Sequence, residues 1–335
     1  TIANSVEPGE KFLVAKKGYF GNRLADMAER YRAEVITIEK EWGEAFSLKE
    51  IESALQEHRP SILAMVHAET STGVCQPMEG IGDLCMKYDC LLLLDTVTSL
   101  GGVPLFLDNW GVDLAYSCSQ KGLSCPPGLG PFTISPKAEA KLNSRKGKVP
   151  NWYLDVSLLN KYWGTDRVYH HTAPVNMNFA IREALRLLSE EGLDNSWIRH
   201  KTNAQALCAG LEKLGLELHV EEKLRLSTLT TVRIPEGIDG KAFTLHLLKE
   251  HGIEISSLSR QFLKSDFNDF DYIIAMDERN YEDLCAMASS KEEQKLISKL
   301  LIHSHPPVDV ENVPDPYYDG GVNGFEQVFQ LCFSG

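Results

Sequence analysis

The stretch LLLLDTVTSLGG, residues 91–102, places four leucines in front of a single aspartate, Asp95, and a loop of small residues. A short and wholly apolar run is typical of a strand that is buried on both faces of a sheet. The carboxylate that ends this run has two interpretations. It caps the turn after the strand, or it faces a ligand at the carboxyl end of the sheet.

Strands and helices alternate through the first 135 residues. Apolar runs predict strands at 11–15, 34–39, 61–68, 91–95, 112–117 and 131–135. Amphipathic segments predict helices at 21–31, 47–58 and 77–88. The second helix begins after Ser47, with Glu50 at the spacing of a capping box. This alternation predicts an α/β fold with a mostly parallel sheet and helices on both faces, and ligands bind such sheets at the strand ends where Asp95 lies.

The pattern changes after residue 135. An aromatic-rich stretch at 151–174 is typical of a connection that crosses an active-site face or a subunit contact. Helices at 175–191, 194–214 and 240–252 and a strand at 226–235 indicate a smaller α+β domain. We therefore expect a large domain at 1–150, a connection and the start of a small domain at 151–253, and a further segment at 254–335.

The 335 residues carry a formal net charge of −13, which is unevenly spread. From Glu254 to the end there are 15 acidic and 6 basic residues, so nine of the thirteen net negative charges lie there. This shift in composition indicates a different origin for the last segment. An acidic chain also argues against binding to nucleic acid or to a membrane surface, because both depend on basic patches. No apolar run reaches about 18 residues, so no membrane span is expected.

Eight cysteines are scattered without a C-x-x-C pair. This pattern indicates reduced thiols in a cytoplasmic protein without a zinc site. No export signal is visible, although organellar targeting stays open because the N-terminus looks incomplete. The adjacent His170 and His171 do not indicate a metal site either, because neighbouring side chains diverge on a regular element.

Lys121 lies in YSCSQKGLSCPPG, among small residues and prolines. One interpretation is a loop lysine with its amine in water. The other is a lysine in a partly desolvated pocket, where the amine can condense with an aldehyde. Together with Asp95 on a neighbouring strand end, the second interpretation predicts a pyridoxal phosphate site, in which the lysine binds the aldehyde and the aspartate holds the protonated ring nitrogen.

Residues 1 to about 253 resemble the alanine–glyoxylate (serine–pyruvate) aminotransferases of class V, which are fold-type I enzymes. The resemblance is carried by VEPGEKFLV, HAETSTGV, LLLLDTVTSLGGVPLFLDNWGVDLAYSCSQKGLSCPPG, YHHTAPV and EGLDNSWIRH. It implies pyridoxal 5'-phosphate as cofactor. It also implies transfer of an amino group from a small amino acid, alanine or serine, to the 2-oxo acid glyoxylate.

The resemblance implies a role for individual residues. Lys121 would carry the cofactor and Asp95 would pair with its ring nitrogen. Phe20 would stack on the ring, where the family usually has a tryptophan, and Val97 would pack on the opposite face. Hydrogen bonds would come from Thr70 to the ring hydroxyl, from Gln120 to the phosphate, and from Tyr169 and Thr172 of a partner subunit to the same phosphate. The partner's residues imply a homodimer with shared active sites.

Two parts of the family pattern have no counterpart in this sequence. The family has an N-terminal region before the position of Thr1, with a Gly-His turn that cradles the phosphate at a helix N-terminus. Its small domain ends with an arginine that clamps the substrate carboxylate. After HGIEISS the arginines are Arg260 and Arg279, in unrelated contexts. The resemblance therefore implies a truncated fold-type I core that binds its cofactor weakly or incompletely.

Residues from about 251 to 335 resemble the C-terminal half of the low-molecular-weight protein tyrosine phosphatases. The matching stretches are HGIEISSLSRQFLKSDFNDFDYIIAMDERNYEDL and VPDPYYDGGVNGFEQVFQL. This resemblance implies a fusion of hybrid origin, in which Asp315 corresponds to the phosphatase general acid. No cysteine is followed by an arginine six positions later, so the phosphatase nucleophile loop is missing from this sequence. A phosphatase-like fusion and a catalytically inactive fusion are the alternatives to an aminotransferase.

Overall fold

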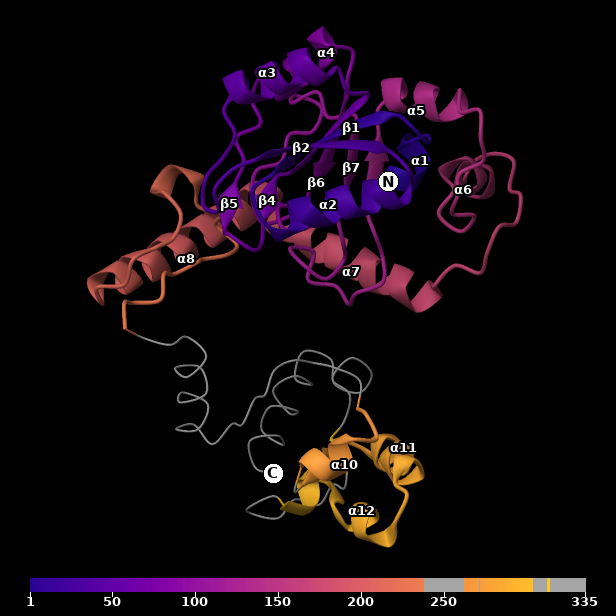
Figure 1. The fold of residues 1–335 in the computed structure, drawn as a ribbon, viewed down its shortest axis with the longest axis vertical. Coiled ribbons are helices and arrows are strands. Elements are labelled where there is room, and N and C mark those ends of the chain that lie inside the picture. Colours follow the sequence, from indigo (N-terminus) through magenta and orange to yellow (C-terminus); the bar gives the residue numbers. More distant parts are fainter. Residues whose placement is uncertain (238–261, 271, 304–311, 314–335) are drawn as a thin grey trace. The chain divides into compact units, whose positions relative to one another are not determined.

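The computed structural model describes residues 1–237, 262–270, 272–303 and 312–313. The chain divides into two compact units, residues 1–243 and 244–335 (Figure 1). In the described part of the chain, no helix has the length and apolar character needed to cross a membrane.

The first unit is built on a six-stranded sheet with the strand order β2-β1-β3-β6-β7-β8. All neighbouring strands are parallel except β7 and β8, which are antiparallel. The predicted α/β class with a mostly parallel sheet is therefore confirmed. The strands are β1 (Lys11–Lys16), β2 (Glu34–Glu39), β3 (Ile62–Val66), β6 (Leu91–Asp95), β7 (Leu114–Tyr116) and β8 (Phe132–Ile134).

Helices cover both faces of the sheet, and β6 lies between them. Leu92 and Leu94 pack on the face covered by α3 (Leu48–His58) and α4 (Ile81–Lys87). Leu91 and Leu93 pack on the other face, which is covered by α1 (Ile2–Ser5), α2 (Tyr19–Arg30) and α5 (Pro136–Asn143). Alternate leucines therefore serve opposite layers, which explains why the whole strand is apolar up to Asp95.

The predicted capping box at the start of α3 is confirmed. The Glu50 N–H donates to Ser47 Oγ at 3.4 Å, and the Ser47 N–H donates to Glu50 Oε2 at 2.9 Å. Two donors that the helix itself cannot satisfy are thus paired.

The rest of the first unit, up to residue 237, contains a short hairpin, three helices and a 3-10 turn. These are β4 (Ala68–Glu69), β5 (Val74–Cys75), α6 (Val156–Trp163), α7 (Val175–Glu191), α8 (Leu193–Lys213) and η1 (Glu222–Leu224).

The strand predicted at 226–235 is wrong. The Leu226 N–H bonds to the Gly73 carbonyl, while the Arg233 N–H bonds to the Glu217 carbonyl, with a turn between them. Because the two ends pair with different segments, no continuous ladder forms, and Val232 makes an isolated bridge to Leu218. The helix predicted at 240–252 lies outside the described residues.

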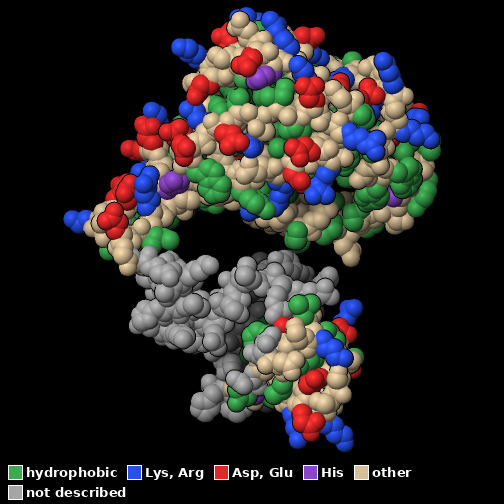
Figure 2. Space-filling view, in the orientation of Figure 1, with side chains coloured by type: hydrophobic (Ala, Val, Ile, Leu, Met, Phe, Trp, Pro, Cys, Tyr) green, Lys and Arg blue, Asp and Glu red, His purple; other side chains and the backbone are tan. Residues whose placement is uncertain are grey.

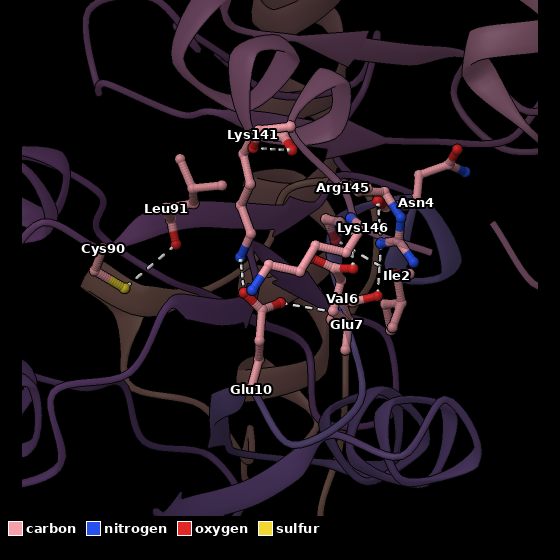
Figure 3. A network of polar contacts seen from close by, with 12 residues as sticks. Ile2, Asn4, Val6, Glu7, Glu10, Cys90, Leu91, Lys141, Arg145 and Lys146 are labelled. Carbon is pink, nitrogen blue, oxygen red and sulfur yellow. Dashed lines mark hydrogen bonds and ion pairs between the residues drawn. The ribbon is translucent and has the colours of Figure 1, made fainter. Parts of the chain in front are cut away.

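A network of polar contacts ties the N-terminal helix to the segment after α5 (Figure 3). Arg145 Nη1 donates to the carbonyl oxygens of Asn4 and Val6 at 2.8 and 2.6 Å. Lys141 forms an ion pair with Glu10 at 2.9 Å. The Asn4 amide also bonds the Leu154 carbonyl and the Val156 N–H, so it anchors the start of α6.

The second unit, in its described residues, is α+β. Two parallel strands, β9 (Ile273–Ala275) and β10 (Ile297–Lys299), form its sheet. Phe267, Ile273 and Ile297 form its core. Around them lie α10 (Asp266–Asp269), α11 (Glu278–Met287), α12 (Lys291–Lys295) and η2 (Leu300–His303). Asp315, the predicted phosphatase-like acid, lies outside the described residues.

Candidate active site

Asp95 ends β6 at the carboxyl edge of the sheet, where it is 6% exposed. Its Oδ1 accepts the Val97 N–H at 2.8 Å, and its Oδ2 accepts the hydroxyl of Tyr116 at 2.6 Å. Burial raises the pKa of this carboxyl group, while the two hydrogen bonds act in the opposite direction. The carboxylate therefore caps its turn, as the first interpretation states. A buried carboxyl group at this edge of the sheet is also compatible with the second interpretation, in which Asp95 faces a ligand.

Lys121 and Thr70 meet at one cavity of about 440 Å³. Thr98 and Thr228 also line it, and the hydroxyls of Thr70 and Thr98 lie 2.5 Å apart. The Lys121 side chain is exposed. Burial raises the pKa of the Cys118 thiol, and the charges of Lys121 and Asp95 act on it in opposite directions, so both groups lie within electrostatic reach of Cys118. Loops after β4, β6 and β7 thus contribute to the wall of this cavity. Two predicted site residues, Thr70 and Lys121, line it, whereas Asp95 does not.

Two glycines let the loops after β6 and β7 touch. A Cβ atom at Gly122 would lie 2.2 Å from the Leu100 carbonyl oxygen. A Cβ atom at Gly101, where φ is +85°, would lie 2.9 Å from the Gly122 carbonyl oxygen. Side chains at these positions would force the backbones apart, so the glycines set the position of Lys121 next to the β6 loop.

Phe20 lies in the first turn of α2, at the same edge of the sheet. Its ring is 5.0 Å from the guanidinium of Arg23, and its N–H donates to Glu69 Oε1 at 3.3 Å. Gln120 is exposed immediately before Lys121, and Val97 is half-buried after Asp95. Their predicted roles toward a cofactor stay predictions.

Tyr169 and Thr172 lie between α6 and α7, outside the lining of this cavity. Both side chains are exposed, and their hydroxyl oxygens lie 3.2 Å apart. Their predicted reach into a partner's site stays a prediction.

The expectation that His170 and His171 diverge is wrong. Their Nδ1 atoms lie 2.8 Å apart, because residues 168–174 form neither a helix nor a strand. Trp152 stacks on the His170 ring with a centroid distance of 4.2 Å. Within the described ranges, no group of three or more His, Cys, Asp or Glu side chains could hold a metal ion.

Three buried ionisable residues near the end of β6 were not predicted from the sequence. Lys17, His67 and Glu69 are 1%, 3% and 0% exposed. Lys17 directly follows β1, and His67 directly follows β3. Part of the signal was available, because His67 ends an apolar run as Asp95 does, whereas Lys17 follows a second lysine, Lys16.

The environment of His67 keeps its ring neutral. Burial, with a contribution from the nearby Lys17 charge, lowers the pKa of His67 to about 3. Its Nε2 lies 3.6 Å from Cys75 Sγ, and its Nδ1 has no hydrogen-bond partner in the described part of the chain.

A second cavity, of about 930 Å³, lies between α8 and residues 218–231. Although larger, it is not lined by any of the predicted cofactor residues. The presence of Thr70 and Lys121 in its lining therefore identifies the smaller cavity as the candidate site.

Residues 1–260 match the family model of class V aminotransferases. The chain belongs to this family. Among its relatives, the alanine–glyoxylate aminotransferase of Callithrix jacchus is 46% identical over 259 residues, which cover 76% of this chain and 63% of that protein. This aminotransferase chain thus spans less than two thirds of the length of that relative.

Two solved aminotransferases have similar structures. An alanine–glyoxylate aminotransferase from Nostoc sp. is 62% identical with a TM-score of 0.73, over 77% of this chain and 70% of that one. The ureidoglycine–glyoxylate aminotransferase of Bacillus subtilis is 38% identical with a TM-score of 0.72, over 77% and 67% of the two chains.

A second family model, that of low molecular weight phosphotyrosine protein phosphatases, matches residues 233–333 of the aminotransferase chain. Both resemblances drawn from the sequence are therefore confirmed. The two matches overlap at residues 233–260, which include the predicted junction.

Proposed function

We propose that this chain carries the core of a pyridoxal-phosphate-dependent aminotransferase that moves an amino group from alanine or serine to glyoxylate. The observation that carries the proposal is that a buried carboxylate, Asp95, and an accessible amine, Lys121, follow neighbouring parallel strands, β6 and β7, at the same edge of the sheet. The names of the relatives support glyoxylate as acceptor, because both an alanine–glyoxylate and a ureidoglycine–glyoxylate enzyme accept it. The amino donors in these two names are alanine and ureidoglycine, so the relatives support the proposed donor less than they support glyoxylate.

The residues present fit pyridoxal phosphate. Asp95 offers a buried acceptor for a protonated ring nitrogen, and Lys121 offers an amine for the aldehyde. Thr70 offers a hydroxyl at the cavity wall for the ring hydroxyl. Phe20 and Val97, which lie outside the lining of the cavity, would supply apolar surface for the two ring faces. Gln120, beside the lysine, would contact the phosphate.

When bound, the cofactor supplies an electron sink for the charge left on the substrate Cα. The protein supplies the proton transfer and the orientation. The Lys121 amine would hold the cofactor in the absence of substrate and then take the Cα proton as general base. Asp95 would fix the ring, with its own position set by Tyr116 and Val97.

We further propose a homodimer in which Tyr169 and Thr172 of one protomer complete the other's phosphate site. Figure 2 shows hydrophobic side chains gathered over α6 and the loop after it. The exposed residues of this stretch are Trp152, Tyr153, Leu154, Trp163, Val168 and Tyr169. Contiguous exposed aromatic and aliphatic surface supports a protein interface. Sedimentation velocity should give a dimer for the wild type and a monomer for Trp163→Glu.

The experiment that tests the proposed function is a titration with pyridoxal phosphate followed by visible absorption. The wild type should develop the band of a lysine-bound cofactor, and Lys121→Ala should not. Lys87→Ala, a surface lysine paired with Glu52, is the matched control and should behave as wild type. A wild type without a band at saturating cofactor would refute the proposal. With cofactor bound, alanine and glyoxylate should give pyruvate and glycine.

For the phosphatase-like segment we propose no phosphatase turnover, because no cysteine in the sequence is followed by an arginine six positions later. Incubation with a chromogenic aryl phosphate should release no product. Product release that disappears in Asp315→Ala would overturn this view.

A further inference from the structure

Lys17 is a buried amine beside the strand end that carries Asp95. Its Nζ donates a hydrogen bond to the carbonyl oxygen of Val66, the last residue of β3. Val66 pairs with Asp95 in the parallel register of β3 and β6, and the His67 N–H donates to the Asp95 carbonyl oxygen at 3.0 Å. The ammonium group is therefore hydrogen-bonded to the backbone of Val66, the residue that pairs with Asp95 in the sheet. No other lysine or arginine of the described residues is buried as a whole.

Two carboxylates face this amine. Glu69, from β4, is fully buried and accepts the N–H groups of Phe20 and Gly21 at 3.3 Å, as well as the hydroxyl of Ser71 at 2.6 Å. Asp95, from β6, is the second carboxylate, and its charge interacts with both Glu69 and Lys17.

The other groups around Lys17 do not replace its charge. His67, after β3, is held neutral, and burial raises the pKa of the Cys75 thiol, in β5, to about 11. Tyr116, in β7, also has a raised pKa because of burial and of Asp95, so it stays a neutral donor. Arg23, in α2, acts on Tyr116 from an exposed position. Lys17 is therefore the buried positive charge that interacts with both Glu69 and Asp95.

Opposing effects act on the charge of Asp95. Burial and the negative charge of Glu69 favour the protonated acid, whereas Tyr116, Val97 and Lys17 favour the carboxylate. Burial lowers the pKa of Lys17 itself to about 8, so the amine is still largely charged at neutral pH. In a site with low dielectric, a charge held at a fixed position acts strongly on its neighbours.

We infer that Lys17 is a positioning residue for the cofactor: its charge keeps Asp95 a carboxylate, so that the proton shared with the cofactor ring lies on the ring nitrogen. This inference rests on the proposed function, since it concerns the same cofactor. If Lys17 were neutral, Asp95 would keep the proton and donate it to an unprotonated ring. A ring without that positive charge is a weaker electron sink.

A structural role makes a different prediction. If Lys17 serves only to satisfy the Val66 carbonyl, Lys17→Gln, which can still donate a hydrogen bond, should behave as wild type. If its charge matters, Lys17→Gln and Lys17→Met should both change the protonation of the cofactor ring nitrogen. Lys16→Met is the matched control, because Lys16 is the preceding residue of the chain and pairs with Glu39 on β2.

The test uses the full chain loaded with pyridoxal phosphate labelled with ¹⁵N at the ring position. Nuclear magnetic resonance distinguishes a protonated from an unprotonated ring nitrogen by its chemical shift. The wild type and Lys16→Met should show the protonated form, and both Lys17 variants should shift toward the unprotonated form. A wild-type shift in a folded Lys17→Gln would overturn the inference. Near-ultraviolet circular dichroism identifies which Lys17 variant is folded. A wild-type shift in a folded Lys17→Met would also overturn the inference.

A second measurement separates a charge effect from a damaged site. Pyridoxal phosphate should bind to Lys17→Gln roughly tenfold more weakly, because the variant removes a charge that favours the carboxylate form of Asp95. The 1-deaza analogue, which has carbon in place of the ring nitrogen, should bind to wild type and variant equally. Equal losses for both ligands would overturn the inference. A wild type that binds neither ligand would instead remove the proposed function, and the inference with it.

Discussion

The hydroxyl of Tyr116 donates to Asp95 Oδ2 at 2.6 Å, and these two residues end neighbouring strands of the sheet. The register places them opposite each other, because Asp95 pairs with Tyr116 between β6 and β7. The orientation of the carboxylate is thus fixed by the sheet itself, before any ligand is bound. Enzyme sites that are organised in advance lose less free energy on binding.

Tyr116→Phe should weaken the binding of pyridoxal phosphate. The variant removes a hydrogen bond that lowers the pKa of Asp95, and hydrogen bonds to charged groups are worth about 1.5–3 kcal/mol. We expect the dissociation constant to rise roughly ten- to a hundredfold in an absorption titration. Tyr88→Phe removes the hydroxyl that contacts Glu52 and is the control. Unchanged affinity in Tyr116→Phe would contradict the assigned role.

Gly122→Ala should displace the loop that carries Lys121. The new methyl group would lie 2.2 Å from the Leu100 carbonyl oxygen, so one backbone must move. We expect a lower melting temperature and loss of most of the visible cofactor band. Gly210→Ala, in α8 with no atom within 4 Å of the added methyl, should instead stabilise the protein by about 1 kcal/mol. Normal cofactor binding by Gly122→Ala would show that the contact between the loops is not needed.

Glu69→Gln should destabilise the first unit by about 1–3 kcal/mol. The change weakens the acceptor for the first turn of α2 and removes a negative charge that faces Lys17. Urea unfolding followed by tryptophan fluorescence measures this unit alone. The five tryptophans all lie within it: Trp42, Trp110, Trp152, Trp163 and Trp197. Glu34→Gln, at an exposed position of β2, should leave the unfolding midpoint unchanged.

The stability of the first unit should fall as the pH falls from 7 to 5.5. The folded pKa of His67 is about 3, whereas an unfolded histidine has a pKa of about 6.5. Below pH 6.5 the unfolded chain therefore binds a proton that the folded chain does not, which favours unfolding. From His67 alone we expect a loss of about 1 kcal/mol over this interval.

The comparison that tests this pH dependence is His67→Gln, which should show a smaller decrease than the wild type. His58→Gln, at the end of α3, should retain the full decrease. Equal pH slopes for wild type and His67→Gln would rule out His67 as the source.

Local patterns predicted much of the fold because they reflect local physics. The bounds of β6 follow from four leucines that serve two layers, and α7 follows from its amphipathic period over 175–191. Segment 226–235 failed because its pairing partners include Gly73, which is distant along the chain. Distant pairing leaves no mark on a segment's own sequence.

In the candidate site, too, some residues could be predicted from the local sequence and others could not. Asp95 and Lys121 could be found because each is an unusual charge in an apolar or small-residue context. Lys17 was missed because KK at the end of a predicted strand is typical of a solvated edge. Only the packing of Glu69 and Val66 around it shows that one of the two lysines is buried.

The Arg145 network has a consequence for how the chain folds during synthesis. Arg145 bonds the carbonyl of Asn4, which is 141 residues earlier in the chain. At ribosomal rates of about 5–20 residues per second, roughly 10 s pass between the emergence of these partners. Until then the carbonyl oxygens of Asn4 and Val6 lack the donor that they have in the folded unit. This link can therefore form only after all six strands of the sheet, the last of which ends at Ile134, have been synthesised.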